Sequence, residues 1–504
     1  MTVPTVTPAG EYRAPHWHDA LLLSLPDRLI SPHTRRWIER VPLVAVVVVF
    51  TALALRLRNG ASADEALAIN SGRDLISSWV TQTAVTGNGE ALSGARYLYP
   101  FLAATLDSVG GLFLVRAFGL ACAVAAILLV SGAVAPRYSH RAGVFAATAF
   151  ALSAPVVFVA ALGTADAVAL ACLAAALWCL AARGSAATAL VAGGLLTLAS
   201  LLEYSTAVLV PVVLVAGAAL SGVGALRRAG YAAGTTVLLT AFAYVVGAGP
   251  GARAWTDFLG DEPLSPQSWT GSLGWLVLDI GVLSALAVLG AVRLAGAGGR
   301  DALVAASLLV GSASFPAAQL WTGEAGTFDR NLAYSALFLA PLAGIALTRM
   351  SRGPWRLGPV LLILPVLVLF GVSRSGVIHG NWPDVRPVAA AILEDPGPGL
   401  YLASGPAAEA LEYSTNDLPA VQWEDTYGLY AQGEDAVRVA VEDLRYETIV
   451  LHSAETGSPA EDAMEDVVLT ALHDNYTDYE LVASIPASGV ADADVWLVYR
   501  QVSR

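Results

Sequence analysis

Lysine is missing from this chain of 504 residues, so all 28 of its basic residues are arginine. A lysine side chain is therefore excluded as a catalytic base. Cysteine is scarce: Cys122, Cys172 and Cys179 lie in apolar runs, which excludes a disulfide framework and a cysteine metal motif. Charged residues make up only 14% of the chain and hydrophobic residues 56%, which is too apolar for an ordinary soluble domain.

Other signals are missing too. Residues 1–40 are polar and contain no apolar core before a cleavage site, so no signal peptide is expected. No internal repeat or low-complexity run occurs. The chain consists instead of successive apolar runs. They predict a polytopic α-helical membrane protein with about eleven transmembrane helices of roughly 15–25 residues, at 42–56, 111–134, 142–162, 166–182, 186–202, 205–221, 229–248, 273–295, 302–321, 332–348 and 358–374.

Charge is divided unevenly along the chain. Residues 375–504 hold 23 acidic residues and 5 Arg, whereas residues 1–374 hold 18 acidic residues and 23 Arg. This asymmetry indicates two parts in different surroundings. We therefore expect a cytoplasmic segment at 1–40, a transmembrane domain at 41–374 with a long loop at 57–110, and a separate domain at 375–504.

The arginines predict the topology, because cytoplasmic loops of membrane proteins are enriched in basic residues. We expect a protein of the plasma membrane with its N-terminus in the cytoplasm. In this orientation about two thirds of the loop arginines lie on the cytoplasmic side. The break at Glu203 is needed for this count. An odd number of spans then places residues 375–504 outside the cell. The arginines on the outer side are Arg56, Arg58, Arg73, Arg96, Arg253, Arg330 and Arg374.

Acidic residues gather on the same outer side. The first loop carries Asp64 and Glu65 directly after the first span, Asp166 begins the fourth span, and Glu203 lies at the tip of a hairpin. The pattern "DEALAINSGRDLISSWV" predicts a helix along the membrane interface, and "YLYPFLAATL" a second one.

The C-terminal segment reads differently. "GLYLASG", "AVQW", "ETIVLHS", "YELVASI" and "DVWLVYR" are typical of strands, and "PAAEALEYS", "EDAVRVAVEDL" and "AEDAMEDVVLTALHD" of helices. This alternation predicts a small α/β domain. It contains no glycine-rich phosphate loop and no metal-ligand spacing.

Asp64 and Glu65 have two interpretations. They are a solvated pair that orients the loop, or one of them is a general base. A carboxylate at a partly desolvated membrane edge can take a proton from an acceptor hydroxyl. Loop 57–110 contains no His and the chain no Lys, so a base in this loop would be a carboxylate. Adjacent residues of a helix point about 100° apart, so only one can face a cleft directly.

The order of several motifs resembles a known family. The acidic pair is followed by "RYLYPFLAATL", "LVRAFGL", "RAGVFAATAFALSAPVVFVAALGTADAVAL" and "GGLLTLASLLEYSTAVLVP". This order resembles the GT-C superfamily of polyprenyl-phosphate-sugar glycosyltransferases, in particular the branch of protein O-mannosyltransferases and lipid A aminoarabinose transferases, over roughly residues 40–350. The resemblance implies a bundle of many spans, catalysis on the extracytoplasmic face and often a C-terminal soluble domain.

The resemblance also implies site residues. Asp64 matches the acid that the family uses as base, with Glu65 as its neighbour. Asp166 in "GTADA" matches a second acid, although a helix N-cap is an equal alternative, with Thr164 competing for it. "LLEYST" falls where many relatives have Thr-Lys-Tyr, so Glu203 replaces the Lys and puts a lipid-phosphate contact by Glu203 or Tyr204 in doubt.

Departure of a lipid phosphate needs a cation, because negative charge develops on the leaving group. Arg330 in "TFDRNLAY", beside Asn331, stands where relatives often carry an Arg-Tyr pair. Its alternative is an interfacial arginine, and Arg96 and Arg253 are reserves. Arg116 lies within a span, where an unpaired charge is costly, so we expect it to pair with a nearby acid. The acids would suit a divalent cation, as in some relatives, but no spacing requires one.

These observations predict an inverting membrane glycosyltransferase. A polyprenyl-phosphate sugar would be the donor, and a glycan, lipid or protein hydroxyl the acceptor; no nucleic acid is expected. One alternative is an arabinofuranosyl or other cell-wall polysaccharide transferase of the same architecture. The other is a lipid or polysaccharide transporter or a non-catalytic partner in a membrane assembly. A transporter should have charges or broken helices near mid-membrane and internal repeats, and the acids here cluster at span ends.

Overall fold

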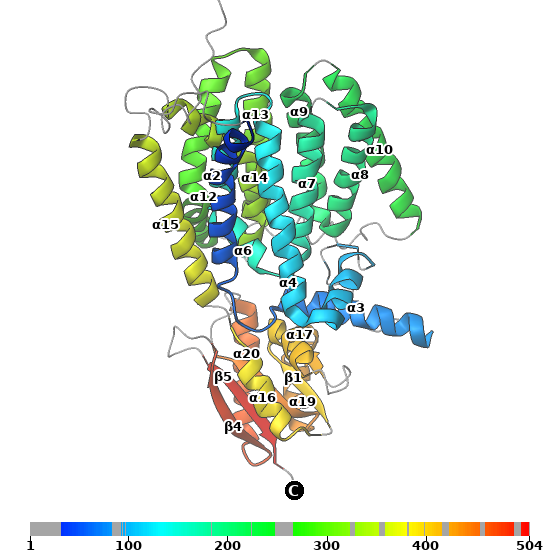
Figure 1. Ribbon diagram of the computed structural model, residues 1–504. Helices are drawn as coiled ribbons and strands as arrows, with labels where there is room; N and C mark the ends of the chain where they lie inside the picture. The colour runs from blue at the N-terminus through cyan, green and yellow to red at the C-terminus, as the bar shows by residue number, and fades with distance from the viewer. Residues whose placement is uncertain are drawn as a thin grey trace, which may run out of the picture.

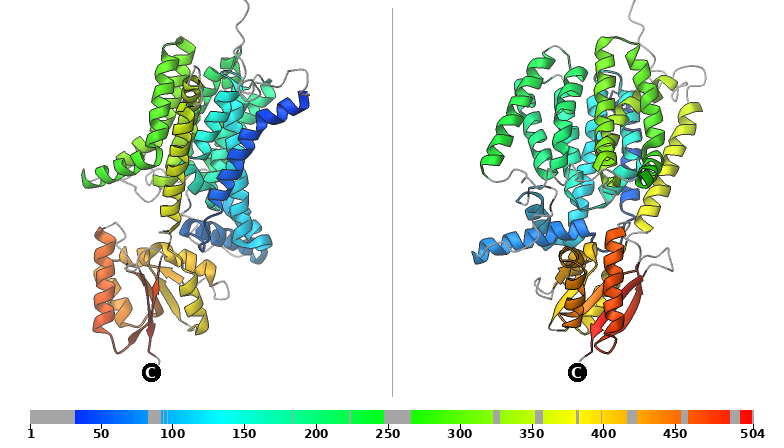
Figure 2. Two further views of the ribbon diagram at one scale, coloured as in Figure 1. Left: turned by 60° about the vertical axis from the view of Figure 1, so that its left-hand side comes forward. Right: turned by 180° about the vertical axis from the view of Figure 1, so that it is seen from behind.

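The chain folds into a helical bundle with a smaller sheet-containing part at one end, as the two sets of views in Figures 1 and 2 show. The structure is a computed structural model of residues 1–504. It describes residues 32–82, 92, 94–95, 97–182, 184–222, 224–246, 266–322, 328–351, 358–380, 383–397, 399–415, 423–453, 459–487 and 495–502.

Every range that the sequence predicts as a span contains helix. The bundle comprises α2 (Pro32–Ala54), α4 (Tyr99–Val134), α5 (His140–Ala151), α6 (Ala154–Ala161), α7 (Ala165–Ala181), α8 (Ala186–Leu202), the 3₁₀ helix η2 (Tyr204–Leu209), α9 (Val210–Leu220), α10 (Ala225–Val245), α12 (Pro266–Ala295), α13 (Gly299–Thr322), α14 (Phe328–Met350) and α15 (Gly358–Gly380). Among the described residues, four helices are long and apolar enough to cross a membrane, or five if a bent pair counts as one span. The number eleven stays a prediction.

The bent pair corrects one expectation. Residues 142–162 do not form one straight span, because α5 and α6 meet at an angle of 66°. The cause is local. Pro155 stands in the first turn of α6, where proline is tolerated, and a continuous helix would have to lose a backbone hydrogen bond there. Helix α6 runs toward the end of the bundle where the sheet lies and ends two residues before Gly163.

Helix α3 (Ala63–Thr81) lies across that end of the bundle, as Figure 1 shows. Its first turn is a capping box, in which the Ser62 side chain accepts from the Glu65 backbone N–H and the Glu65 side chain accepts from the Ser62 N–H. The second helix that the sequence predicts along the interface is the first arm of α4, which a kink at Gly110 and Gly111 separates from the rest. The two helices touch at Gly72, where a Cβ would lie 2.0 Å from the carbonyl oxygen of Pro100.

The C-terminal part is a five-stranded sheet with helices. Its strands are β1 (Leu400–Ala403), β2 (Trp423–Asp425), β3 (Tyr446–His452), β4 (Tyr479–Pro486) and β5 (Val495–Gln501), in the spatial order β2-β1-β3-β5-β4. Strands β2, β1 and β3 are parallel, and β5 is antiparallel to both of its neighbours. The predicted strands and helices are present, including α17 (Gly405–Ser414), α19 (Glu434–Glu442) and α20 (Pro459–Asp474). The short α16 (Arg386–Glu394) and α18 (Thr426–Tyr430) were not predicted.

Alternate residues of these strands enter two cores, as expected for a sheet covered on both faces. Tyr401 and Ala403 of β1 pack with α16 and α17, whereas Leu402 packs with α19 and α20. The first core also includes Ala61 and Ala66, which precede and begin α3. The sheet part and the bundle therefore share apolar contacts through α3.

Polar contacts strengthen the same junction. The Asn70 side chain donates to the Glu409 carbonyl oxygen at 3.1 Å, and the Tyr413 hydroxyl donates to Asp107 at 2.8 Å. Asp107 also accepts from Arg73 at 2.7 Å, so that α3, α4 and α17 are joined in one network. Helix α3 is thus held between the bundle and α17.

Candidate active site

The half-exposed carboxylate of Asp64 faces Arg330 at the start of α14. The Arg330 Nη1 donates to the Asp64 Oδ2 at 2.8 Å, and the two side chains are 49% and 17% exposed, Asp64 being the more accessible. The two residues come from opposite ends of the long membrane segment and meet because α3 crosses the bundle end. A carboxylate that solvent or substrate can reach therefore stands beside a mostly buried guanidinium.

Asp166 approaches the same guanidinium from α7. Its Oδ2 lies 3.8 Å from the Arg330 Nη1 and accepts from the Thr164 hydroxyl at 2.9 Å. Its Oδ1 accepts from the Tyr334 hydroxyl at 3.2 Å. The N-cap position of α7 belongs to Thr164, and Asp166 is the second residue of the helix, within its first turn. The alternative in which Asp166 serves as the N-cap is therefore wrong.

Glu65 has quite different surroundings from its neighbour. Its side chain is fully buried, and its two oxygens accept four hydrogen bonds: from the backbone N–H groups of Ser62 and Gly163, and from the Nε and Nη2 of Arg116. Arg116 thus pairs with an acid, as the sequence predicts. Both oxygens are occupied, so Glu65 is built to fix α3 against α4 and the end of α6 rather than to move protons.

Of the remaining residues that the sequence suggests for the site, Glu203, Tyr204 and Asn331 are described by the structure, and Arg96 and Arg253 are not. Glu203 is buried between α8 and η2, accepts from Ser205 at 2.9 Å and lies within electrostatic range of Arg330. Tyr204 and Asn331 are half-buried beside it and beside Arg330, respectively. Arg96 and Arg253 lie outside the described residues.

The described residues of the site do not form a ligand set for a metal ion. The described residues contain no group of three or more His, Cys, Asp or Glu side chains that could hold an ion. The Arg330 Nη1 lies 2.8 Å from the Asp64 Oδ2 and 3.8 Å from the Asp166 Oδ2, so a guanidinium is the cation that these two acids share. The expectation from the sequence, that these acids would suit a divalent cation although no spacing requires one, stays a prediction.

Sequence reasoning missed Tyr334. Its side chain is among the largest that are fully buried, stacks on Phe315 with ring centroids 5.1 Å apart and reaches Asp166 with its hydroxyl. The signal was present, since Tyr334 follows Arg330 by four residues and such pairs share one helix face. Together, Arg330 and Tyr334 present a cation and a hydroxyl to two acids from one face of α14.

The arrangement offers two chemical elements side by side. Asp64 is an accessible carboxylate that can accept a proton from a hydroxyl. Arg330 is a permanent cation with its Nη1 engaged by the acids; among the described residues its Nε and Nη2 have no hydrogen-bond partner. These N–H groups have the planar geometry that recognises phosphate oxygens.

Comparison with known proteins identifies the fold. No family model and no curated protein sequence matches the chain. Among solved structures, ArnT from Cupriavidus metallidurans superposes with a TM-score of 0.59 at 14% identity, over 92% of this chain and 98% of that chain. The archaeal oligosaccharyltransferase AglB from Archaeoglobus fulgidus gives 0.58 at 12%, over 93% and 74%.

A third similar structure is the arabinofuranosyltransferase AftD from Mycobacteria, with a TM-score of 0.52 at 15% identity, over 92% of this chain but only 40% of that chain. The fold is that of GT-C glycosyltransferases, and the resemblance predicted from the sequence is confirmed at the level of the fold.

Proposed function

We propose that the chain is an inverting glycosyltransferase that moves a sugar from a polyprenyl-phosphate donor to an acceptor hydroxyl. The observation that carries the proposal is the convergence of Asp64, Asp166 and Arg330 at the end of a GT-C bundle. Two of the similar structures contain lipid phosphates: an ArnT is bound to undecaprenyl phosphate, and AglB is in complex with a dolichol-phosphate. These ligands support the class of donor.

In the proposed reaction Asp64 removes the proton of the acceptor hydroxyl as its oxygen attacks the anomeric carbon. The bond between that carbon and the phosphate oxygen breaks, and the electron pair leaves with the lipid phosphate. Arg330 stabilises this anion, because a preorganised cation at the point where charge develops lowers the barrier. A direct displacement inverts the configuration at the anomeric carbon.

Asp166 and Tyr334 have a supporting role in this proposal. Asp166 is buried and lies 3.8 Å from Arg330, and Tyr334 donates to it. Their contacts hold the guanidinium in place while Asp64 is free to exchange its arginine contact for the acceptor hydroxyl. Rigid support of this kind is what keeps a reacting pair in productive geometry.

The proposal includes a side of the membrane. The arginine bias favours a plasma-membrane protein with a cytoplasmic N-terminus, so that the bundle end with α3 and the sheet part would face away from the cytoplasm. Donor lipid and acceptor would then meet at the outer membrane boundary. The acceptor is a glycan, lipid or protein hydroxyl.

The test is a transfer assay in membranes with labelled polyprenyl-phosphate sugars. Asp64→Asn keeps the shape and removes the base, so transfer should fall by about 10²–10⁴-fold, the usual contribution of a general base. Asp74→Asn, a substitution of another acid of α3, is the matched control and should retain parental turnover. If Asp64→Asn turned over like the parent at matched protein levels, Asp64 would not be the base.

A second substitution tests the anion site. Arg330→Ala should weaken use of the lipid donor while the protein stays inserted in the membrane. Unchanged donor kinetics would remove Arg330 from the mechanism and direct attention to Arg96 and Arg253.

An arabinofuranosyl or other cell-wall polysaccharide transferase is the second candidate, and the likeness to AftD favours it. Including a polyprenyl-phosphate arabinofuranose among the donors distinguishes the two. A transporter or a non-catalytic assembly partner predicts no transfer with any donor of the panel. It also predicts that Asp64→Asn leaves the protein's function unchanged.

A further inference from the structure

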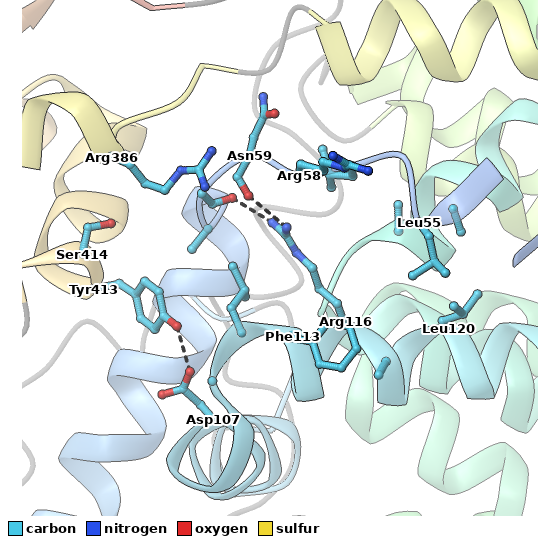
Figure 3. Close-up of a pocket in the computed structure, with 18 of the residues that line it drawn as sticks. Leu55, Arg58, Asn59, Asp107, Phe113, Arg116, Leu120, Arg386, Tyr413 and Ser414 are labelled. Atoms are coloured by element: carbon cyan, nitrogen blue, oxygen red, sulfur yellow. Dashed lines mark hydrogen bonds between the residues drawn. The ribbon is translucent and has the colours of Figure 1, made fainter. Parts of the chain in front are cut away.

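A cavity of about 770 Å³ lies at the junction between the bundle and the sheet part, away from the Asp64–Arg330 pair. It is enclosed by the end of α2 and the loop that follows it, Arg73 of α3, the kinked part of α4, the end of α6, and the facing ends of α16 and α17 (Figure 3). Among the described residues, its lining does not include Asp64, Asp166 or Arg330. It is therefore separate from the candidate active site.

The polar wall of this cavity is cationic. Four arginines line it and only one acid does: Arg58, Arg73, Arg116 and Arg386 against Asp107. The carboxylates that pair with Arg116 and Arg386, which belong to Glu65 and Asp384, are not part of the lining. Arg73, Arg116 and Arg386 each have a carboxylate partner, whereas Arg58 is exposed and forms no ion pair with any described residue. The positive charge that the described residues leave uncompensated in this wall is that of Arg58.

The guanidinium of Arg116 is fixed in the cavity wall. Its Nη1 donates to the Asn59 carbonyl oxygen at 3.0 Å and its Nη2 to the Gly60 carbonyl oxygen at 2.8 Å, as the dashed lines of Figure 3 indicate. Tyr413 and Ser414 stand on the opposite side, from α17, with hydroxyls that already donate to Asp107 and to the Ala410 carbonyl oxygen. The groups of this wall that can bind phosphate oxygens are therefore the guanidinium N–H groups.

The rest of the wall is apolar and belongs to the membrane helices. Leu55 and Phe113 line the cavity and are nevertheless 54% and 73% exposed. Leu112, Leu120 and Ala161 continue the apolar surface from α4 and α6. Helix α4 and the bent pair of α5 and α6 are apolar enough to cross a membrane. The apolar side of the cavity therefore borders the region of lipid chains.

We propose that the cavity binds an anionic membrane phospholipid, with its phosphate against Arg58, Arg116 and Arg386 and its chains along Leu55 and Phe113. A cationic wall beside an exposed apolar wall fits a lipid with a negatively charged headgroup. A free anion would contact only the cationic wall, and a neutral lipid only the apolar wall. The bound lipid joins α2 and α4 to α16 and α17. It contacts Arg116, whose other partner is Glu65, the residue next to Asp64.

The test measures lipid retention by the purified full-length protein. The protein is incubated in detergent with phosphatidylglycerol, phosphatidylcholine or undecaprenyl phosphate, and retained lipid is counted by native mass spectrometry. We expect retention of phosphatidylglycerol over phosphatidylcholine. Arg58→Glu should weaken that retention by at least about fivefold, the effect of one arginine near an anionic headgroup, and Ala117→Phe should weaken it by filling the apolar side.

Arg227→Glu is the matched control, because Arg227 is exposed near the start of α10 and does not line the cavity. It should retain phosphatidylglycerol like the parent. The proposal is overturned if Arg58→Glu and Ala117→Phe both retain phosphatidylglycerol like the parent. It is also overturned if they reduce retention of undecaprenyl phosphate alone, since the occupant would then be the lipid carrier. Because the readout is binding, failure of sugar transfer does not affect this result.

Discussion

Asp64 and Glu65 are consecutive residues whose carboxylates meet different arginines, Arg330 for Asp64 and Arg116 for Glu65. The first contact is half-exposed and the second is buried. One step along a helix turns a side chain by about 100°, which is enough to direct neighbouring acids toward different neighbours of α3. The acidic pair is therefore one accessible carboxylate and one structural carboxylate.

The Glu65–Arg116 pair should matter chiefly for stability. Glu65→Gln leaves Arg116 as an uncompensated charge in a mostly buried site, and breaking such a pair typically costs about 3–5 kcal/mol. We expect a marked loss of thermal stability in detergent and less protein in the membrane. Asp64→Asn, at an exposed position of the same turn, should unfold at the parental temperature. Equal stability of Glu65→Gln and the parent would contradict the assigned role.

Tyr334 should support transfer through Asp166. Tyr334→Phe deletes one hydrogen bond to a buried carboxylate, a contact worth about 1.5–3 kcal/mol when one partner is charged. We expect kcat/KM for the lipid donor to fall by about tenfold or more. The control is Tyr138→Phe, which deletes the hydrogen bond of 3.1 Å to Asp301 elsewhere in the bundle. If both variants lowered transfer equally, the loss would reflect general stability.

The junction between α3 and α17 should respond to pH through Glu412. Burial, together with the nearby charges of Glu409 and Asp74, raises the pKa of Glu412 to about 8, against an opposing effect of Arg73. The folded protein therefore holds a proton that the unfolded chain releases near the ordinary value of 4.5. Stability is greatest below this range and falls as the pH rises from about 4.5 to about 8.

Glu412→Gln mimics the protonated acid and should reduce this fall, raising the unfolding temperature at pH 8 relative to the parent. The comparison is Glu465→Gln, because burial raises the pKa of Glu465 only to about 7. In Glu465→Gln the unfolding temperature should still fall between pH 7 and pH 8, as it does in the parent. Thermal unfolding of the full chain between pH 5 and pH 9 decides the matter. Parallel curves for Glu412→Gln and the parent would refute the assignment.

The proposed orientation predicts which cysteines an impermeant thiol reagent reaches on intact cells. Glu442→Cys, on an exposed position of α19, should be labelled, and Arg227→Cys, at the opposite end of the bundle, should not. The parent, with cysteines only in apolar helices, gives the background. Labelling of Arg227→Cys but not of Glu442→Cys would reverse the orientation.

The sequence predicts the elements well because each depends on local patterns. Short apolar runs mark β3 and β5, and the Ser62 capping box begins α3 where the acidic pair suggests it. The break at Glu203 is also local, since α8 ends at Leu202. The bend between α5 and α6 is local as well, since Pro155 stands in the first turn of α6, but the apolar run across it predicts one continuous span.

The site needs information that no local pattern contains. Arg116 lies 51 positions from Glu65, and Tyr334 lies 168 positions from Asp166. The motifs could place several acids and arginines at one end of the bundle, but which acid meets which arginine depends on how α3, α7 and α14 pack. For the same reason the cavity at the junction leaves no trace in the sequence, because its walls come from six separate segments.

The position of α17 has a consequence for protein engineering. Because α17 packs along α3 and bonds to Asn70 and, through Tyr413, to Asp107, the outer surface of α3 is matched to one particular C-terminal sequence. A chimera that exchanged residues 383–502 for the equivalent part of another protein would put foreign side chains against this surface. To keep α3 seated, the exchange would have to carry over α3 and the first arm of α4 as well, so the transplantable unit is discontinuous in the chain.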